Sequence, residues 1–243
     1  MIKEAIQHYK QSHGYSHFSP HCVLFDMDGV LYNSMPNHAV AWHEAMKQFG
    51  IHFTADDSYA TEGARGVDTI RKYVLEQQGK EISSEEAQRM YDVKTEIFHH
   101  MPIAEIFPGV IDIMQKIKSA GMTIGVVTGS GQRPLIKRLL NDFDGFLTED
   151  HIVTAYDVER GKPNPDPYLM GLRKTGNNNP WQGIVVENAP LGVRAGSAAN
   201  CFTIGINSGP LPDSALADNG ADIVLQQMTD LCNLWDEILQ NID

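Results

Sequence analysis

Two acidic residues follow directly after a short apolar run near the start of the chain. Cys22 to Phe25 is continuously apolar, and Asp26 and Asp28 come next, just before Gly29. Such a run is typical of a strand that is buried on both faces of a parallel sheet. Alternate residues of an extended chain point the same way, so both carboxylates can face one site. Two close carboxylates require a shared proton or a bound cation, and we expect Mg²⁺, which prefers oxygen ligands.

Three later segments offer groups that complement these carboxylates. They are the turn Thr128-Gly129-Ser130 after an expected strand at 122–127, Lys162 in the proline-rich loop 161–167, and Glu187 with Asn188 after an expected strand at 183–186. Ligands of open parallel sheets bind outside the carboxyl ends of the strands, so we expect these segments to converge. Hydroxyl, lysine and backbone N–H groups can hold phosphate oxygens. Together the groups predict phosphoryl transfer, which depends mostly on positioning and charge neutralisation.

Helical periodicity replaces the strand pattern between residues 35 and 103. We expect helices at 36–49, 68–78 and 84–99, with a polar, glycine-broken loop at 61–66. An insert of this kind predicts a small helical cap over the active edge of the sheet. The predicted division is therefore a catalytic α/β core of residues 1–34 and 104–243, with a cap of residues 35–103. The core is expected to contain further helices at 2–11, 109–120, 133–141, 167–174, 191–199 and 229–239, and strands at 22–25, 122–127, 152–154, 183–186, 201–205 and 222–225.

Composition excludes several classes of protein. The net charge is −12 and there is no basic run, which argues against nucleic acid or an anionic membrane as partner. No apolar run approaches the ~20 residues of a membrane span. The N-terminus lacks the apolar core of a signal peptide. The three cysteines form no metal-binding pair. The cysteines are typical of a reduced, cytoplasmic protein. We also expect a monomer, and the phosphate-binding groups described above predict a small phosphorylated substrate.

From Cys22 to Leu231 the sequence resembles the haloacid dehalogenase superfamily of phosphatases. The four segments that carry the resemblance are Asp26-Met27-Asp28-Gly29-Val30, Thr128-Gly129-Ser130, Lys162-Pro163 and Glu187-Asn188-Ala189-Pro190-Leu191-Gly192-Val193. The insert after the first segment resembles the four-helix cap of the β-phosphoglucomutase-like branch. The resemblance implies a Rossmann-like parallel-sheet core with that cap inserted.

The resemblance also implies a role for each matching residue. Asp26 would be the nucleophile that becomes an aspartyl phosphate, and Asp28 the general acid and base. Thr128, the N–H of Gly129, and Ser130 would hold the phosphoryl oxygens, and Lys162 would neutralise the nucleophile. The implied Mg²⁺ ligands are Asp26, Asp28 with the Met27 carbonyl beside it, Glu187 and Asn188. Because Asp28 is present, a phosphatase or mutase is favoured over a dehalogenase.

Two positions depart from the family pattern. Many members have a second acid where this chain has Asn188, so one negative charge is missing from the core. In mutases the cap loop reads Lys-Gly with an arginine three residues after the glycine, whereas here Glu62 precedes Gly63 and Gly66 stands in the arginine's place. His38 does match a mutase histidine, which keeps a β-phosphoglucomutase or small sugar-phosphate phosphatase as an alternative.

A glutamate on the cap could ligate the same Mg²⁺ and restore the missing charge. This arrangement resembles the Bacteroides type of inorganic pyrophosphatase within the branch, so inorganic pyrophosphate is the favoured substrate. Glu62 would then be a further metal ligand, and His38, Arg65 and Lys94 would contact the substrate. Lys94 could reach the leaving phosphate or could be an ordinary solvated helix lysine. A more distant alternative is a phospho-receiver, in which an aspartate is phosphorylated without turnover.

Overall fold

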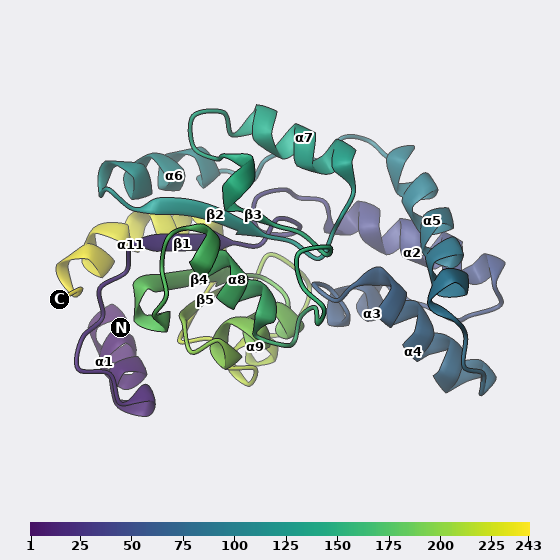
Figure 1. Cartoon of the computed structure of the whole chain (residues 1–243), viewed down its shortest axis with the longest axis horizontal. Helices are drawn as coiled ribbons and strands as arrows, with labels where there is room; N and C mark the ends of the chain where they lie inside the picture. Colours follow the sequence, from purple (N-terminus) through teal and green to yellow (C-terminus); the bar gives the residue numbers. More distant parts are fainter.

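Six parallel strands form the centre of the molecule, which is described for all of residues 1–243 by a computed structural model (Figure 1). Their order across the sheet is β3-β2-β1-β4-β5-β6. The strand that ends at Asp26 lies between the two strands that end before Thr128 and Asn188, since Phe25 pairs with both Val126 and Val186. The strands are β1 Cys22–Phe25, β2 Thr123–Val127, β3 Ile152–Val153, β4 Gly183–Glu187, β5 Phe202–Ile206 and β6 Ile223–Leu225.

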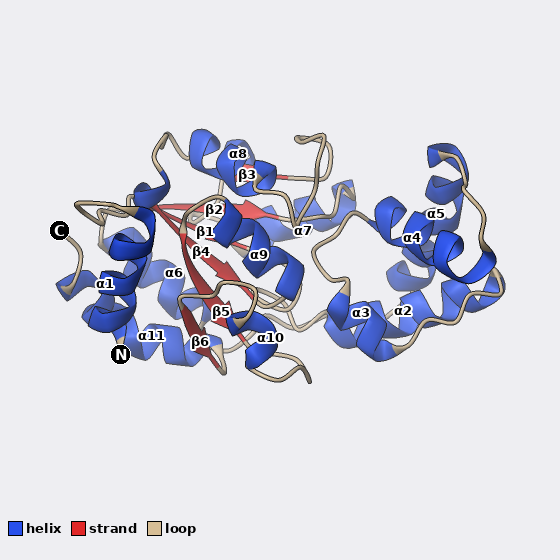
Figure 2. Cartoon of the chain, turned by 90° about the horizontal axis from the view of Figure 1, so that it is seen from below, coloured by secondary structure: helices blue, strands red, loops and turns tan.

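Helices cover both faces of this sheet, as Figure 2 shows. One face packs against α1 Ile2–His13, α6 Val110–Ser119, α7 Arg133–Asp142 and α11 Met228–Gln240 in a cluster of 32 buried residues. The other face packs against α8 Asp166–Lys174 and α9 Pro190–Ala198 in a cluster of ten. Val23 and Phe25 belong to the first cluster and Cys22 and Leu24 to the second, which is the alternation of a strand buried on both sides. The predicted Rossmann-like fold is confirmed.

Four helices form a separate lobe beside the carboxyl ends of the strands. They are α2 Met35–Gln48, α3 Ala55–Ala60, α4 Gly66–Gln78 and α5 Ser84–His99. The lobe has a hydrophobic cluster of its own, which includes Trp42, Phe53 and Tyr73. It is connected to the core by residues 33–34 and 100–105.

The structure corrects the predicted elements in several places. Helix α3 was not expected, because six residues are too few to show a helical period. It begins at a capping box in which the side chains of Thr54 and Asp57 each accept a backbone N–H of the other. The short helix α10 Ser214–Ala217 was missed for the same reason. Helix α1 extends two residues beyond the prediction and ends at Gly14, whose φ of 67° favours glycine. The other predicted ends agree with the structure or differ by at most two residues. None of the helices is long and apolar enough to cross a membrane.

Residues before β1 are an integral part of the core. Ile2, Ile6 and Tyr9 are buried in the larger cluster. The carboxylate of Asp243 accepts a hydrogen bond from the backbone N–H of Phe18 and pairs with Lys10. The N-terminal segment thus also fixes the C-terminus of the chain.

Asp222, just before β6, gives the fold a testable dependence on pH. Burial raises the pKa of this carboxyl to about 7, although a hydrogen bond from the Thr203 N–H lowers it. The unfolded carboxyl ionises near pH ~3.9. Between these two values the folded state binds the additional proton, so the free energy of unfolding falls as the pH rises.

Asp222→Asn removes this titration and keeps an oxygen for the Thr203 N–H. We expect the variant to lose the decline between pH 4 and 7, and to exceed the parent at pH 8 by at most about 4 kcal/mol, the equivalent of about three pKa units. Urea unfolding at a series of pH values measures both curves. An unchanged slope in the variant would assign the titration to another group.

Candidate active site

The predicted site residues meet in a cavity of about 70 Å³ between the core and the cap. The core contributes the carboxyl ends of β1 and β2, and the cap contributes α2, the loop before α4, and α5. Eight of the predicted residues line this cavity: Asp26, Asp28, His38, Glu62, Lys94, Thr128, Gly129 and Ser130. The convergence follows from the strand order, because β1 lies beside β2 and β4 at the same level.

Lys162 joins two carboxylates beneath the cavity. Its Nζ lies 2.5 Å from Asp26 Oδ1 and 2.6 Å from Glu187 Oε1, and donates to the Val127 carbonyl at 3.0 Å. All three charged side chains are almost fully buried. Burial alone would lower the pKa of Lys162, but Asp26 and Glu187 raise it above its ordinary value. Lys162 is therefore a permanent positive charge against the Asp26 carboxylate.

Glu187 holds this lysine in place. Its Oε1 also accepts the Tyr168 hydroxyl, and its Oε2 accepts the backbone N–H groups of Asn188 and Ala189. A Cβ at Gly192 would lie 1.8 Å from Glu187 Oε1, so only glycine leaves room for the carboxylate. Glu187 was predicted as a metal ligand; here its oxygens receive protein donors, and it does not line the cavity.

Asp28, His38 and Lys94 form a chain of contacts along the cap side. Lys94 Nζ lies 2.6 Å from His38 Nδ1, and His38 Nε2 lies 3.1 Å from Asp28 Oδ1. An ammonium can only donate, so Nδ1 accepts and the ring proton is on Nε2, facing Asp28. Burial raises the pKa of Asp28, but His38, Ser34 and Lys94 outweigh it and bring this pKa down to about 2. Asp28 is thus ionised before substrate binds.

Lys94 is not the solvated helix lysine that was one of its two interpretations. It is 2% exposed, and its Nζ lies 4.9 Å from the ring centroid of Phe98 and 5.3 Å from that of Trp42. Burial lowers the pKa of Lys94 to about 8, although Asp28 raises it. A partly desolvated ammonium on the cap wall is suited to binding an anionic or hydroxyl-bearing leaving group.

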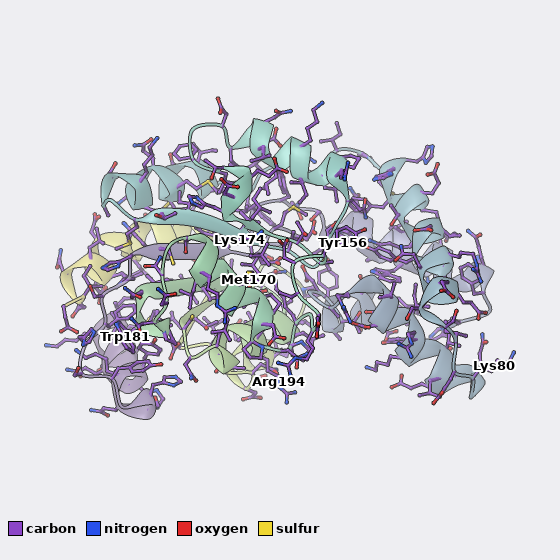
Figure 3. The ribbon with its side chains drawn as sticks, in the orientation of Figure 1. Lys80, Tyr156, Met170, Lys174, Trp181 and Arg194 are labelled. Carbon is purple, nitrogen blue, oxygen red and sulfur yellow. The ribbon has the colours of Figure 1, made fainter.

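Glu62 connects the cap to the core. Both of its carboxylate oxygens lie 3.0 Å from Asn188 Nδ2. The cap loop also packs on the predicted phosphate loop, since a Cβ at Gly129 would lie 2.9 Å from the Gly63 carbonyl oxygen. The cap is therefore closed over the site. On the other side of this loop, the Tyr156 ring covers Gly131 at the edge that faces the cap (Figure 3).

The donor atoms fit a divalent cation. Burial, together with Asp26, raises the pKa of Glu62 well above its ordinary value. Burial raises the pKa of Asp26 to about 8, although Lys162 lowers it. Asn188 Oδ1 is buried without a hydrogen-bond partner. Excess negative charge and an unpaired amide oxygen both suit a hard cation, although no three acidic, histidine or cysteine side chains are gathered at ligand spacing. If Mg²⁺ binds here, the residues that would hold it are Asp26, Asn188 and Glu62, with the Met27 carbonyl beside them.

Arg65 is not brought to the catalytic cavity. Its Nε donates to Asp68 Oδ2 at 2.7 Å, and its side chain packs over Gly161 at the seam between cap and core. Sequence reasoning also missed Ser34, whose hydroxyl donates to Asp28 Oδ1 at 2.6 Å, and Tyr91, which lines the cap wall. Ser34 lies just before the expected helix at 36–49, so its sequence position indicates a helix cap and not a partner of Asp28. Tyr91 reads as part of the apolar face of α5.

Removing Glu187 should destabilise the core. Glu187→Ala leaves Lys162 facing Asp26 alone and strands the Tyr168 hydroxyl, and breaking a buried ion pair costs about 3–5 kcal/mol. Tyr168→Phe is the matched control and should cost about 1 kcal/mol, because it removes one neutral donor. Urea unfolding in metal-free buffer measures both. Equal losses of unfolding free energy in the two variants would show that Glu187 does not hold the cluster together.

Comparison with known proteins agrees with this geometry. A family model described as haloacid dehalogenase-like hydrolase matches residues 23–206. Hexitol phosphatase A of Escherichia coli (strain K12) is 31% identical over 84% of this chain and 90% of its own length. β-Phosphoglucomutase of Bacillus subtilis (strain 168) is 25% identical over 86% of this chain and 90% of its own. A solved structure described as a "putative beta-phosphoglucomutase" from Bacteroides vulgatus has a TM-score of 0.95 and 45% identity, covering 100% of this chain and 98% of that one. The chain therefore belongs to the haloacid dehalogenase-like hydrolases, in their β-phosphoglucomutase-like subfamily.

Proposed function

We propose that this protein is a Mg²⁺-dependent phosphohydrolase of small phosphorylated compounds, and that Asp26 is its nucleophile. The observation that carries the proposal is the position of the Asp26 carboxylate. It stands at the end of β1, 2.5 Å from Lys162 Nζ, in the same cavity as Thr128 and Gly129. A carboxylate beside a fixed positive charge and a phosphate-binding turn is suited to attack on phosphorus.

Each core residue has a separate task in this reaction. Asp26 attacks the phosphorus atom and forms an aspartyl phosphate as the leaving oxygen departs. Thr128 and the N–H groups of the following turn hold the phosphoryl oxygens, while Lys162 holds Asp26 in line. Bound Mg²⁺ would supply additional positive charge to the phosphoryl group. Water then attacks the intermediate and releases orthophosphate and free Asp26.

Proton transfer is assigned to Asp28. It is ionised in the substrate-free site, so a proton must reach it before it can protonate the leaving oxygen. The chain from Lys94 through His38 ends at Asp28 Oδ1 and offers a route for that proton. In the second step the ionised Asp28 accepts a proton from the attacking water.

The relatives favour a sugar or polyol phosphate as substrate. Their names include Hexitol phosphatase A, Glycerol-1-phosphate phosphohydrolase 2 and β-phosphoglucomutase. His38 and the ionised Asp28 are compatible with either a phosphatase or a mutase. Sugar and polyol phosphates are therefore the first class of substrate to test.

Inorganic pyrophosphate is a second candidate, and the cap favours it. The cavity under the cap measures about 70 Å³, whereas a cavity that holds one water molecule measures about 10–15 Å³ on the same scale. Glu62 reaches Asn188 across the seam, where it can bind the same cation as Asp26. A cap drawn onto the metal in this way leaves room for a compact leaving group, and Lys94 is placed to receive its charge.

Two substitutions test the proposed chemistry. Asp26→Asn should lower turnover by about 10³-fold or more, because no covalent intermediate can form. Asp28→Asn should cost about 10²–10⁴ in rate for alkyl phosphates and less, in single-turnover formation of the intermediate, for a nitrophenyl phosphate whose leaving group needs no proton. Initial rates with Mg²⁺ measure the first effect. Turnover within tenfold of the parent in Asp26→Asn would overturn the nucleophile, and an absence of multiple turnover in the parent would favour a phospho-receiver.

Substitution of Glu62 distinguishes between the two candidate substrates, pyrophosphate and sugar phosphates. If Glu62 binds the cation of the closed state, Glu62→Ala should raise the Mg²⁺ concentration for half-maximal activity by about tenfold or more. It should also lower pyrophosphate turnover while sparing larger phosphate esters, because only ligands with differential affinity shift the closure. The exposed cap residue Glu76 provides the matched control, Glu76→Ala. If Mg²⁺ dependence and the ratio of pyrophosphate to sugar-phosphate rates match those of the parent, Glu62 has no part in metal binding or substrate choice.

A further inference from the structure

The cap wall of the catalytic cavity is an aromatic ring that packs on a glycine. Tyr91 on α5 and Gly66 at the start of α4 both line the cavity. A Cβ at Gly66 would lie 2.1 Å from Cε2 and 2.2 Å from Cδ2 of Tyr91. The ring therefore occupies the space in which any side chain at position 66 would lie. The position of the Tyr91 ring, called its seat below, therefore requires a glycine at position 66.

Neighbours on three elements hold the ring in this seat. The ring centroid of Trp42, on α2, is 5.9 Å from that of Tyr91, and Lys94 Nζ is 5.7 Å from the Tyr91 centroid. Burial raises the pKa of Tyr91, although the nearby polar side chains of Gln132 and Thr95 lower it, and the hydroxyl stays protonated at neutral pH. Gln132 lies in the core just beyond the phosphate-binding turn, so the ring position is tied to both lobes.

This wall lies opposite the proposed phosphoryl site. Asp26 and Thr128 form the core end of the cavity, and Tyr91 with Trp42 and Lys94 forms the cap end. A substrate whose phosphoryl group sits at Asp26 must place its leaving group between the two ends. The cavity holds about 70 Å³, so the position of one ring decides which leaving groups fit under the closed cap.

We propose that Tyr91, seated on Gly66, sets the upper size of the leaving group. The closed site then accepts a phosphate or a two- to three-carbon polyol, whose charge or hydroxyls meet Lys94, and it excludes a six-carbon leaving group. This inference rests on the proposed function and deepens it, because it selects compact substrates over hexitol and hexose phosphates.

Truncation of the ring tests the inference. The measured quantity is kcat/KM for a hexitol phosphate divided by kcat/KM for pyrophosphate, and the same ratio with glycerol phosphate as the small substrate. Tyr91→Ala should raise these ratios by about tenfold or more, the usual worth of fit in a pocket. Tyr91→Phe should leave them close to the parent's values, since the ring is kept. If Tyr91→Ala does not fold, as judged by circular dichroism, Tyr91→Leu replaces it with the same expected direction.

Two further variants separate a size limit from general damage to the cap. Phe53→Leu removes a buried cap ring that does not line the cavity, and it should leave the ratios unchanged. Gly66→Ala should displace the Tyr91 ring and alter the ratios, and this effect should vanish in the Tyr91→Ala background, because the two residues act through one contact. Additive effects would contradict a shared seat.

The outcomes distinguish this inference from the proposed function. If Asp26→Asn abolishes turnover but Tyr91→Ala lowers kcat/KM for all substrates by the same factor, the size limit is wrong and the proposed phosphohydrolase activity stands. A shift in Phe53→Leu as large as that in Tyr91→Ala would also overturn the size limit. If the parent hydrolyses none of these compounds, both the proposed function and the inference fail.

Discussion

The buried contact among Asp26, Lys162 and Glu187 is the constraint on which the site depends. Two carboxylates and one ammonium lie almost fully out of water, and they are tolerable there only because each has a partner at hydrogen-bond distance. The sheet supplies the geometry, because β1 and β4 are adjacent and end at the same level. Glu187, satisfied by backbone and Tyr168, fixes the lysine, and the lysine fixes the nucleophile.

This arrangement leaves more negative charge than Lys162 and Lys94 can balance. Asp26, Asp28 and Glu62 share a small cavity, and burial together with the neighbouring carboxylates raises the pKa values of Asp26 and Glu62. A divalent cation at Asn188 Oδ1 would relieve this excess and would also tie the cap to the core. Chemistry and closure of the cap would then depend on the same ion. Lys94 and Tyr91, on one helix of the cap, would act only when that closure is complete.

The convergence of the core residues was predictable from the sequence, because each of them ends a recognisable strand or stands in a rigid loop. Asp26, Thr128 and Lys162 could be placed together from the order of strands in a parallel sheet. The burial of Lys94 could not be predicted, because a lysine in an amphipathic helix is ordinarily solvated, and its aromatic surroundings come from α2 and α5 together. The buried cluster around Glu187 was not predicted, because two of its four donors, Lys162 Nζ and the Tyr168 hydroxyl, lie 25 and 19 residues away in sequence, and the other two are the backbone N–H groups of the next two residues. Arg65 was predicted to contact the substrate because it lies in the cap loop at 61–66. Its hydrogen bond to Asp68, which holds it away from the cavity, could not be seen in the sequence.

The central claim is that Asp26 receives the phosphoryl group, and a direct test is to find that group on the protein. Rapid mixing of the Asp28→Asn variant with Mg²⁺ and substrate, followed by acid quench and mass spectrometry of peptides, can trap the intermediate, because loss of the general base slows its hydrolysis. The account predicts one added phosphoryl group on the peptide that spans β1, located at Asp26 by fragmentation. Phosphate on any other residue, or product formed in a burst without any phosphorylated peptide, would contradict it.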